Sequence, residues 1–330
     1  MDIQQIAKSL VADNKGILAA DESFGTIEKR FQKINLESTE ENRRIYRELL
    51  FTTPNVEEFI SGVIMFDEST RQHSGDSRSF IQVLEDKGII PGVKVDKGKV
   101  PLPGSPEEAV TEGLDGLRDR LKEYVGMGLK FTKWRGVIAI GDGLPTKNAV
   151  RANAHALARY AALAQEAGMV PIVEPEVLMD GTHDLEKCAD VTAMTLDEVF
   201  SELMIAKVDL KGMLLKPNMV ISGKDASKQA SAEEVADATI EVFKKSVPSE
   251  VAGIVFLSGG QSAQEATKNL CEINRRNSGK HPWPLSFSFG RALQNEALET
   301  WHGDGNNWQH AQEAFYNAAK ADAEARRGIC

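Results

Sequence analysis

The sequence predicts an α/β fold in which residues 1–330 form a single (β/α)8 barrel domain with additional N- and C-terminal helices. Two observations lead to this fold. Short apolar runs, many of them β-branched, alternate with segments of helical spacing, as in proteins built around a parallel sheet. The runs number eight, which suits a closed barrel better than an open doubly wound sheet with its usual five or six strands.

Each apolar run is short enough to form one buried strand of a parallel sheet. The expected strands cover residues 16–21, 60–66, 92–96, 131–140, 170–177, 212–220, 253–258 and 285–289. Helices are expected between them, because apolar residues then recur at intervals of three and four. The clearest helical patterns run from Ala149 to Ala167, from Leu185 to Leu203 and from Trp308 to Arg326.

The composition is that of an ordinary globular protein, with 42% hydrophobic and 27% charged residues. Lysine and arginine number 39 against 49 aspartates and glutamates, which gives a net charge of −10. This balance argues against a partner such as nucleic acid or an anionic membrane surface, both of which attract positive charge. No stretch approaches the roughly 18 unbroken apolar residues of a membrane span, so we expect no membrane association.

The start of the chain has neither a basic leader followed by an apolar run nor the character of a transit peptide. The three cysteines, Cys188, Cys271 and Cys330, suggest no disulfide framework. We therefore expect a cytoplasmic protein with reduced thiols.

Charged residues interrupt the apolar runs close to their ends. In a barrel the active site lies at the C-terminal ends of the strands, and residues two apart in a strand point to the same side. A salt bridge would explain any one same-face pair, but several buried charges on neighbouring strands favour a common polar centre. The charges are Asp21, the pairs Lys94/Asp96, Lys133/Arg135 and Glu174/Glu176, and Lys216.

Lys216 is the candidate nucleophile. Its neighbours along the chain are apolar, so its ammonium is desolvated, and a nearby Lys133 would disfavour a second positive charge. A neutral amine is the form that attacks a carbonyl carbon. The alternative is a structural lysine whose ammonium reaches water.

Glu174 and Glu176 are candidates for proton transfer, because imine formation needs acid and base assistance to lose water. An ion pair with Lys133 or Lys216 is the alternative, and it is compatible with this role.

Two loops after the last strands are candidates for phosphate binding. Glycines let backbone N–H groups approach an anion, and phosphate sites of barrels occupy these loops. A plain turn is the alternative for either loop. The loop residues are Ser258, Gly259, Gly260, Ser288, Gly290 and Arg291.

Lys29, Arg30 and Arg135 could bind a second phosphate group. On their own, Lys29 and Arg30 are as well explained by a solvated helix face.

Seven motifs, in order along nearly the whole chain, resemble the class I (Schiff-base-forming) fructose-1,6-bisphosphate aldolases. They are Leu18-Ala-Ala-Asp21-Glu-Ser23, Lys94-Val-Asp-Lys97-Gly98, Lys133-Trp-Arg135, Val173-Glu-Pro-Glu176, Leu214-Leu-Lys216-Pro-Asn218, Leu257-Ser-Gly-Gly-Gln261-Ser262 and Phe287-Ser-Phe-Gly-Arg291-Ala-Leu293. The resemblance implies a lyase of glycolysis and gluconeogenesis that acts on phosphorylated sugars, needs no metal or organic cofactor, and forms a homotetramer.

The resemblance also implies individual roles. Lys216 matches the imine-forming lysine, Glu174 the acid/base of imine formation, and Asp21 the base for carbon–carbon cleavage. Lys133 and Glu176 match groups that tune the charge around Asp21. The residues that match one phosphate site of the family are Ser258, Gly259, Gly260, Ser288, Gly290 and Arg291. Those that match groups near the other phosphate or the sugar hydroxyls are Ser23, Lys29, Arg30, Lys94 and Arg135.

Three features depart from the family pattern. Thr26 replaces a common serine, Phe289 replaces a common tyrosine, and the given chain ends at Cys330 without the tail that finishes in a tyrosine in animal and plant relatives. We therefore expect the enamine intermediate to be protonated by another group.

Other functions fit less well. A zinc-dependent aldolase needs clustered histidines, whereas the six histidines here are scattered. The turn Gly141-Asp-Gly143 hints at dinucleotide binding, but Thr146 occupies the place of the third glycine. A transaldolase or a catalytically idle scaffold remain alternatives.

Overall fold

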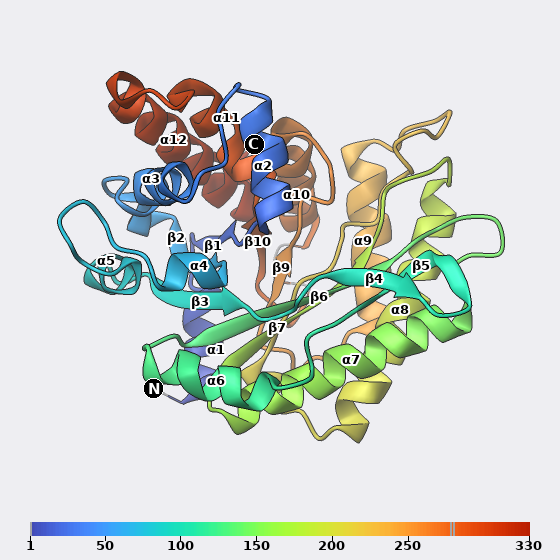
Figure 1. Ribbon diagram of the computed structural model, residues 1–330. Helices are drawn as coiled ribbons and strands as arrows, with labels where there is room; N and C mark the ends of the chain where they lie inside the picture. Colours follow the sequence, from blue (N-terminus) through green and yellow to red (C-terminus); the bar gives the residue numbers. More distant parts are fainter. Residues whose placement is uncertain (1, 278, 280) are drawn as a thin grey trace.

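A computed structural model describes residues 2–277, 279 and 281–330, and it shows a closed barrel surrounded by helices (Figure 1). All neighbouring barrel strands are parallel, in the order β1-β10-β9-β8-β7-β6-β3-β2. The predicted (β/α)8 barrel is therefore confirmed. The barrel strands are β1 (Gly16–Ala20), β2 (Ile60–Met65), β3 (Ile90–Lys94), β6 (Phe131–Ile138), β7 (Val170–Val177), β8 (Leu214–Leu215), β9 (Ile254–Phe256) and β10 (Leu285–Phe289).

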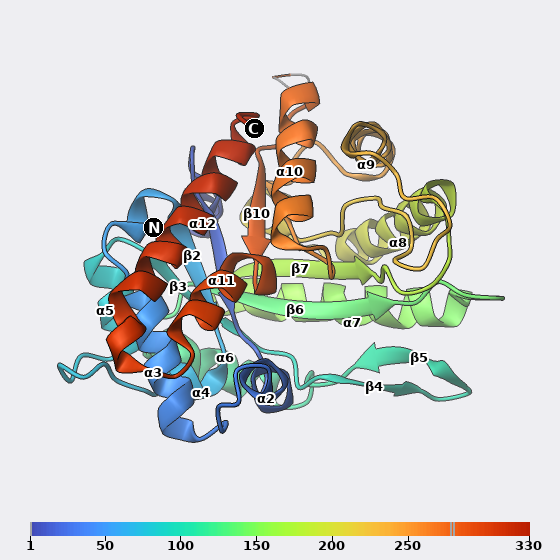
Figure 2. The same ribbon diagram turned by 90° about the horizontal axis from the view of Figure 1, so that it is seen from above.

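Helices follow the strands and cover the outside of the barrel (Figures 1 and 2). The three helices with the clearest apolar periodicity, α7, α8 and α12, lie where the sequence predicts them. Among the described helices, none combines the length and the apolar character that a membrane crossing requires. The helices are α1 (Ile3–Leu10), α2 (Phe24–Gln32), α3 (Glu40–Phe51), α4 (Asp67–Thr70), α5 (Phe80–Asp86), α6 (Leu117–Gly126), α7 (Lys147–Glu166), α8 (Leu185–Ile205), α9 (Ala232–Ser246), α10 (Ala263–Asn277), α11 (Arg291–Trp301) and α12 (Trp308–Arg326).

The N-terminal end of the barrel is apolar. Helix α1 contributes Ile6, Ala7 and Leu10 to one buried cluster with residues from six barrel strands. Gly92 in β3 makes room inside this cluster, because a Cβ there would lie 2.5 Å from the ring of Phe131. This end is thereby filled, which leaves the C-terminal ends of the strands for polar side chains.

A β-hairpin between β3 and β6 was not predicted. Strands β4 (Lys99–Leu102) and β5 (Ser105–Thr111) pair antiparallel and extend away from the barrel (Figure 2). The run is short, partly exposed and contains Pro101, so it carries little of the apolar signal by which buried strands are recognised. The hairpin is nevertheless anchored, because the Thr111 hydroxyl donates to the carbonyl of Arg135 in β6 at 2.6 Å.

The expectation of reduced thiols is wrong for two of the three cysteines. Cys271 in α10 and Cys330 form a disulfide, with their Cα atoms 5.9 Å apart. Helix α12 packs against α10 and so brings two cysteines together that are 59 residues apart in the chain, a proximity that sequence spacing does not reveal. The end of α12 is also held at Arg326, whose guanidinium donates to the carbonyls of Val11, Ala12 and Lys15.

Helix α12 also carries a buried carboxyl group. Asp322 is 3% exposed, and its Oδ1 lies 2.6 Å from the hydroxyl of Thr267 in α10. That hydroxyl also lies 2.9 Å from the carbonyl of Ala263. A hydroxyl has one hydrogen to donate, so Thr267 donates to only one of these two oxygens at a time and gives the buried carboxylate little support. Burial accordingly raises the pKa of Asp322 to about 7.

We predict that Asp322 makes folding depend on pH. Its folded-state pKa of about 7 lies above its ordinary value of 3.8, so its contribution is fully present near pH 4 and is lost as the pH rises through 7. Asp322→Asn should therefore be more stable than the wild type at pH 8, by on the order of a few kcal/mol. Urea unfolding between pH 4 and 8 measures this difference.

Asp197→Asn, at an exposed position of α8, is the matched control and should leave the pH dependence unchanged. Parallel stability curves for wild type and Asp322→Asn would show that Asp322 is ionised in the folded protein.

Candidate active site

A cavity of about 570 Å³ opens at the C-terminal ends of the strands. All sixteen residues proposed from the sequence as catalytic or substrate-binding line it. Nine lysines and arginines line the cavity against five carboxylates, although the whole chain carries a net charge of −10. The cavity is thus a region of local positive charge in an acidic protein, which favours an anionic ligand.

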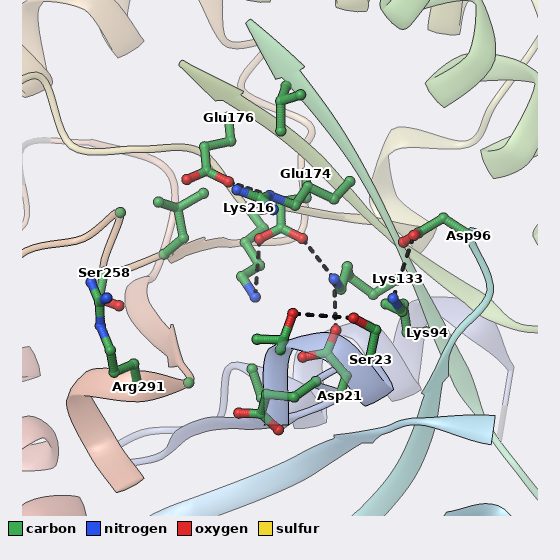
Figure 3. A pocket seen from close by; sticks show the side chains of 18 of the residues that line it. Asp21, Ser23, Lys94, Asp96, Lys133, Glu174, Glu176, Lys216, Ser258 and Arg291 are labelled. Atoms are coloured by element: carbon green, nitrogen blue, oxygen red, sulfur yellow. Dashed lines mark hydrogen bonds and ion pairs between the residues drawn. The ribbon is translucent and has the colours of Figure 1, made fainter. Parts of the chain in front are cut away.

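Four charged groups form a chain of ion pairs at the floor of the cavity (Figure 3), of which Lys133, Glu174 and Lys216 are buried and Asp21 is partly buried. Lys133 Nζ lies 2.6 Å from Asp21 Oδ2 and 3.1 Å from Glu174 Oε2. Lys216 Nζ lies 3.3 Å from Glu174 Oε1. Glu174 therefore uses one oxygen for each lysine.

The barrel strands bring these groups together. Asp21 directly follows β1, Lys133 and Glu174 lie within β6 and β7, and Lys216 directly follows β8. The Lys216 amide donates to the carbonyl of Val173 at 2.8 Å, which places its side chain level with Glu174 on the neighbouring strand. The sequence predicts the proximity of these residues, but not that Glu174 separates the two lysines.

The ion pairs control the protonation of the buried groups. Burial by itself raises the pKa of Asp21 and of Glu174, but the positive charges around each carboxylate, with Lys133 first among them, outweigh burial and hold both pKa values below the ordinary range. Burial lowers the pKa of Lys133, whereas Asp21 and Glu174 raise it and prevail. At neutral pH both carboxylates are ionised and Lys133 is protonated.

The remaining same-face charges pair nearby. Arg135 in β6 donates to Glu176 in β7, and Lys94 Nζ lies 3.6 Å from Asp96 Oδ1. Asp96 Oδ2 is buried and has no hydrogen-bond partner within the described residues. This oxygen is therefore a candidate acceptor for a ligand hydroxyl.

The loops after β9 and β10 have the geometry of an anion site. Gly259 and Gly260 have φ angles of +57° and +90°, which few residues other than glycine adopt. A Cβ at Gly260 would lie 2.5 Å from Met179 Sδ and 3.6 Å from Arg291 Nη2, so Arg291 lies beside this loop (Figure 3). The hydroxyl of Ser288, which is 1% exposed and lines the cavity, has no hydrogen-bond partner within the described residues.

Arg30 lies at this same anion site. A Cβ at Gly290 would be 3.7 Å from Arg30 Nη2, so the guanidinium faces the loop after β10. The sequence analysis expected Arg30 near the second phosphate group, whereas the structure places it beside the loop that carries Gly290 and Arg291. Arg30 lies in α2, which contributes several residues to the cavity lining. The spacing of residues in the sequence does not show which loop this helix approaches. Lys29, its neighbour, is exposed at the rim of the cavity.

The sequence analysis missed several cavity residues. Lys33 follows Lys29 by one helical turn, a spacing that could have identified it. Lys99 and Thr111 come from the hairpin that was not predicted. Glu22 directly follows Asp21 in the motif Leu18-Ala-Ala-Asp21-Glu-Ser23, and the sequence alone did not indicate that its side chain lines the cavity.

Neither the histidine cluster of a zinc site nor the glycine turn considered for dinucleotide binding lies at this cavity. None of the six histidines lines it, and in the described parts of the chain histidine, cysteine, aspartate and glutamate do not gather in groups of three that could hold a metal ion. The turn at Gly141 and Gly143 lies outside the cavity lining, and Thr146 instead caps helix α7 through the amide of Ala149.

Known proteins share both the sequence and the fold. The family model "Fructose-bisphosphate aldolase class-I" matches residues 2–329. A probable fructose-bisphosphate aldolase class 1 of Xanthomonas campestris is 53% identical over 99% of each chain. The cytosolic fructose-bisphosphate aldolase 4 of Arabidopsis thaliana is 51% identical over 95% of this chain and 80% of the relative.

A solved structure of fructose-bisphosphate aldolase from Plasmodium falciparum, in complex with TRAP and a small-molecule inhibitor, superimposes with a TM-score of 0.97. It is 46% identical in sequence, and the match covers 99% of this chain and 94% of that chain. Similarity of this extent in both sequence and fold places the chain in the class I fructose-bisphosphate aldolase family.

Proposed function

We propose that this protein cleaves fructose 1,6-bisphosphate reversibly into dihydroxyacetone phosphate and glyceraldehyde 3-phosphate through an imine on Lys216. The single observation that carries the proposal is the position of Lys216 Nζ, 3.3 Å from Glu174 Oε1, at the centre of a cavity rich in positive charge. The names of the relatives support the reaction.

Imine formation uses the contact between Lys216 and Glu174. Transfer of one proton from the Lys216 ammonium to the Glu174 carboxylate gives both a neutral amine and a carboxylic acid. The amine adds to the C2 ketone of the sugar, and one of its protons moves to the former carbonyl oxygen, which becomes a hydroxyl. Glu174 then returns its proton to the hydroxyl that leaves as water, and the product is a protonated imine.

Carbon–carbon cleavage uses Asp21 on the other side of Lys133. The Asp21 carboxylate takes the proton of the C4 hydroxyl, the bond between C3 and C4 breaks, and its electron pair moves into the protonated imine to form an enamine. Lys133, 2.6 Å from Asp21, keeps this base ionised before the reaction and offsets charge as the base takes up its proton. Glyceraldehyde 3-phosphate then leaves, Asp21 gives up the proton that it took, and one proton is added to the enamine at C3. Hydrolysis of the imine releases dihydroxyacetone phosphate and restores Lys216.

The two phosphate groups of the substrate fit opposite sides of Lys216. Ser258, Gly259, Gly260, Ser288, Gly290, Arg291 and Arg30 would bind one of them. Lys94, Arg135 and Ser23, with Lys29 at the rim, would bind the other phosphate or the sugar hydroxyls. Figure 3 shows Lys94 and Arg291 on opposite sides of Lys216.

We also propose that the reaction needs no metal ion or organic cofactor, because the protonated imine supplies the electron sink. By resemblance to its family the protein would act in glycolysis and gluconeogenesis, as a single-domain subunit of a homotetramer in the cytoplasm. Relatives from Arabidopsis named cytosolic support this location. In a reducing cytoplasm the Cys271–Cys330 disulfide would open, and Arg326 would still hold the end of α12.

The purified protein should cleave fructose 1,6-bisphosphate at the same rate with and without EDTA. The expected products are measured by a coupled assay for dihydroxyacetone phosphate. Loss of activity in EDTA that zinc restores would contradict the imine mechanism.

Borohydride added with dihydroxyacetone phosphate should attach the reduced triose covalently to Lys216. Peptide mass spectrometry locates the adduct. Lys216→Ala should lose the adduct and at least about three orders of magnitude in turnover, because nucleophile and electron sink disappear together. Lys245→Ala, on the exposed face of α9, is the control and should retain both. An adduct on Lys133 or Lys94 would show that the nucleophile is misassigned.

A further inference from the structure

A buried network lies beneath the anion site and connects three helices. Arg47 in α3 is 3% exposed, and its Nη2 lies 2.5 Å from Glu22 Oε2. The other oxygen of Glu22, Oε1, lies 2.5 Å from Nη1 of Arg30 in α2. One carboxylate is thus shared between a buried arginine and an arginine of the cavity.

Gln294 connects this network to the loop after β10. Its side-chain amide donates to Glu22 Oε1 at 3.0 Å and to the carbonyl of Ala19 at 2.7 Å. Gln294 lies in the first turn of α11, where its backbone N–H donates to the carbonyl of Gly290 at 3.1 Å. Glu22 is therefore held in place relative to the same loop that Arg30 faces.

The charge balance of the network depends on Arg47. Burial would raise the pKa of Glu22, but Arg30 and Arg47 outweigh it and hold this pKa below its ordinary value, so Glu22 carries a negative charge. With Arg47 present, the side chains of Arg30, Arg47 and Glu22 carry a net charge of +1. Without Arg47, Glu22 would neutralise Arg30, and the guanidinium beside Gly290 would offer an anion little net attraction.

We infer that Arg47 is a positioning residue for phosphate binding: by sharing Glu22, it leaves Arg30 with a net positive charge and a fixed orientation at Gly290. The inference rests on the proposed function in one respect: the proposed function identifies the bound phosphate as a phosphate group of the substrate. Arg47 itself is absent from the cavity lining, so it acts through its neighbours: it pairs with Glu22, and its Nη1 also donates to Gln294 Oε1 at 3.5 Å.

The test is the affinity for inorganic phosphate, measured by isothermal titration calorimetry, together with steady-state kinetics. Arg47→Gln removes the charge and keeps an amide donor near Glu22. Loss of one unit of positive charge beneath the anion should weaken phosphate binding by about tenfold at an effective dielectric constant near 20. KM for fructose 1,6-bisphosphate should rise to a similar extent, with kcat within about twofold of wild type. Arg47→Met serves if Arg47→Gln does not fold.

Two further variants separate this role from a loss of packing. Arg47→Lys keeps the charge and should bind phosphate within about threefold of wild type. Arg47→Gln combined with Glu22→Gln removes a positive and a negative charge together, and it should recover most of the lost affinity. Arg43→Gln is the matched control, because Arg43 lies one turn earlier in α3, pairs with Glu68 at 2.5 Å, and does not line the cavity.

Wild-type phosphate affinity in Arg47→Gln would overturn the inference. So would a failure of Glu22→Gln to restore the affinity. Phosphate binding requires no turnover, so a protein that binds phosphate through Arg47 but cleaves no sugar would reject the proposed function and leave the inference standing.

Discussion

The cavity depends on the sharing of one buried carboxylate, Glu174, between two buried lysines. An unpaired charge in this position would be expensive to bury, and neither lysine alone would satisfy both oxygens. Lys133 and Lys216 lie at 3.1 Å and 3.3 Å from the two oxygens, and Asp21 completes the chain at 2.6 Å from Lys133. The same contacts that make burial tolerable also place Glu174 beside Lys216, which are the acid/base group and the nucleophile of the proposed mechanism.

The barrel supplies the rigidity that this arrangement requires. Lys133 and Glu174 come from the neighbouring strands β6 and β7 and Lys216 directly follows the next strand, β8, whereas Asp21 follows β1 on the opposite side of the barrel. Backbone hydrogen bonds between the neighbouring parallel strands determine which of their side chains lie level with one another. The apolar cluster under α1 fills the opposite end of the barrel, and the charged side chains of the cavity gather at the end where ligands have access. The network of Arg47, Glu22 and Gln294 extends the same principle outward, since Glu22 contacts Arg30 of the cavity at 2.5 Å and is itself shared with the buried Arg47.

Much of this could be predicted from the sequence, because the physical signals are local. Eight apolar runs predict the barrel, charges two residues apart predict same-face pairs, and glycines beside Ser258 and Arg291 predict an anion loop. What could not be predicted depends on contacts between distant segments. Arg135 pairs with Glu176 across two strands, Arg30 turns toward Gly290, and Cys271 meets Cys330 only because α12 packs on α10. The hairpin β4–β5 escaped prediction for another reason, since it buries too little apolar surface to produce a pattern.

The central claim is that Lys133 keeps Glu174 and Asp21 ionised despite their burial. The most direct test is a carbon-13 NMR titration of the two side-chain carboxyl groups in the wild type and in Lys133→Gln. We expect the pKa of Glu174 to lie below its ordinary value of 4.5 in the wild type and to rise above it in the variant, with the pKa of Asp21 rising alongside. A wild-type Glu174 that titrates at or above 4.5, or one whose titration is unchanged by Lys133→Gln, would contradict this account.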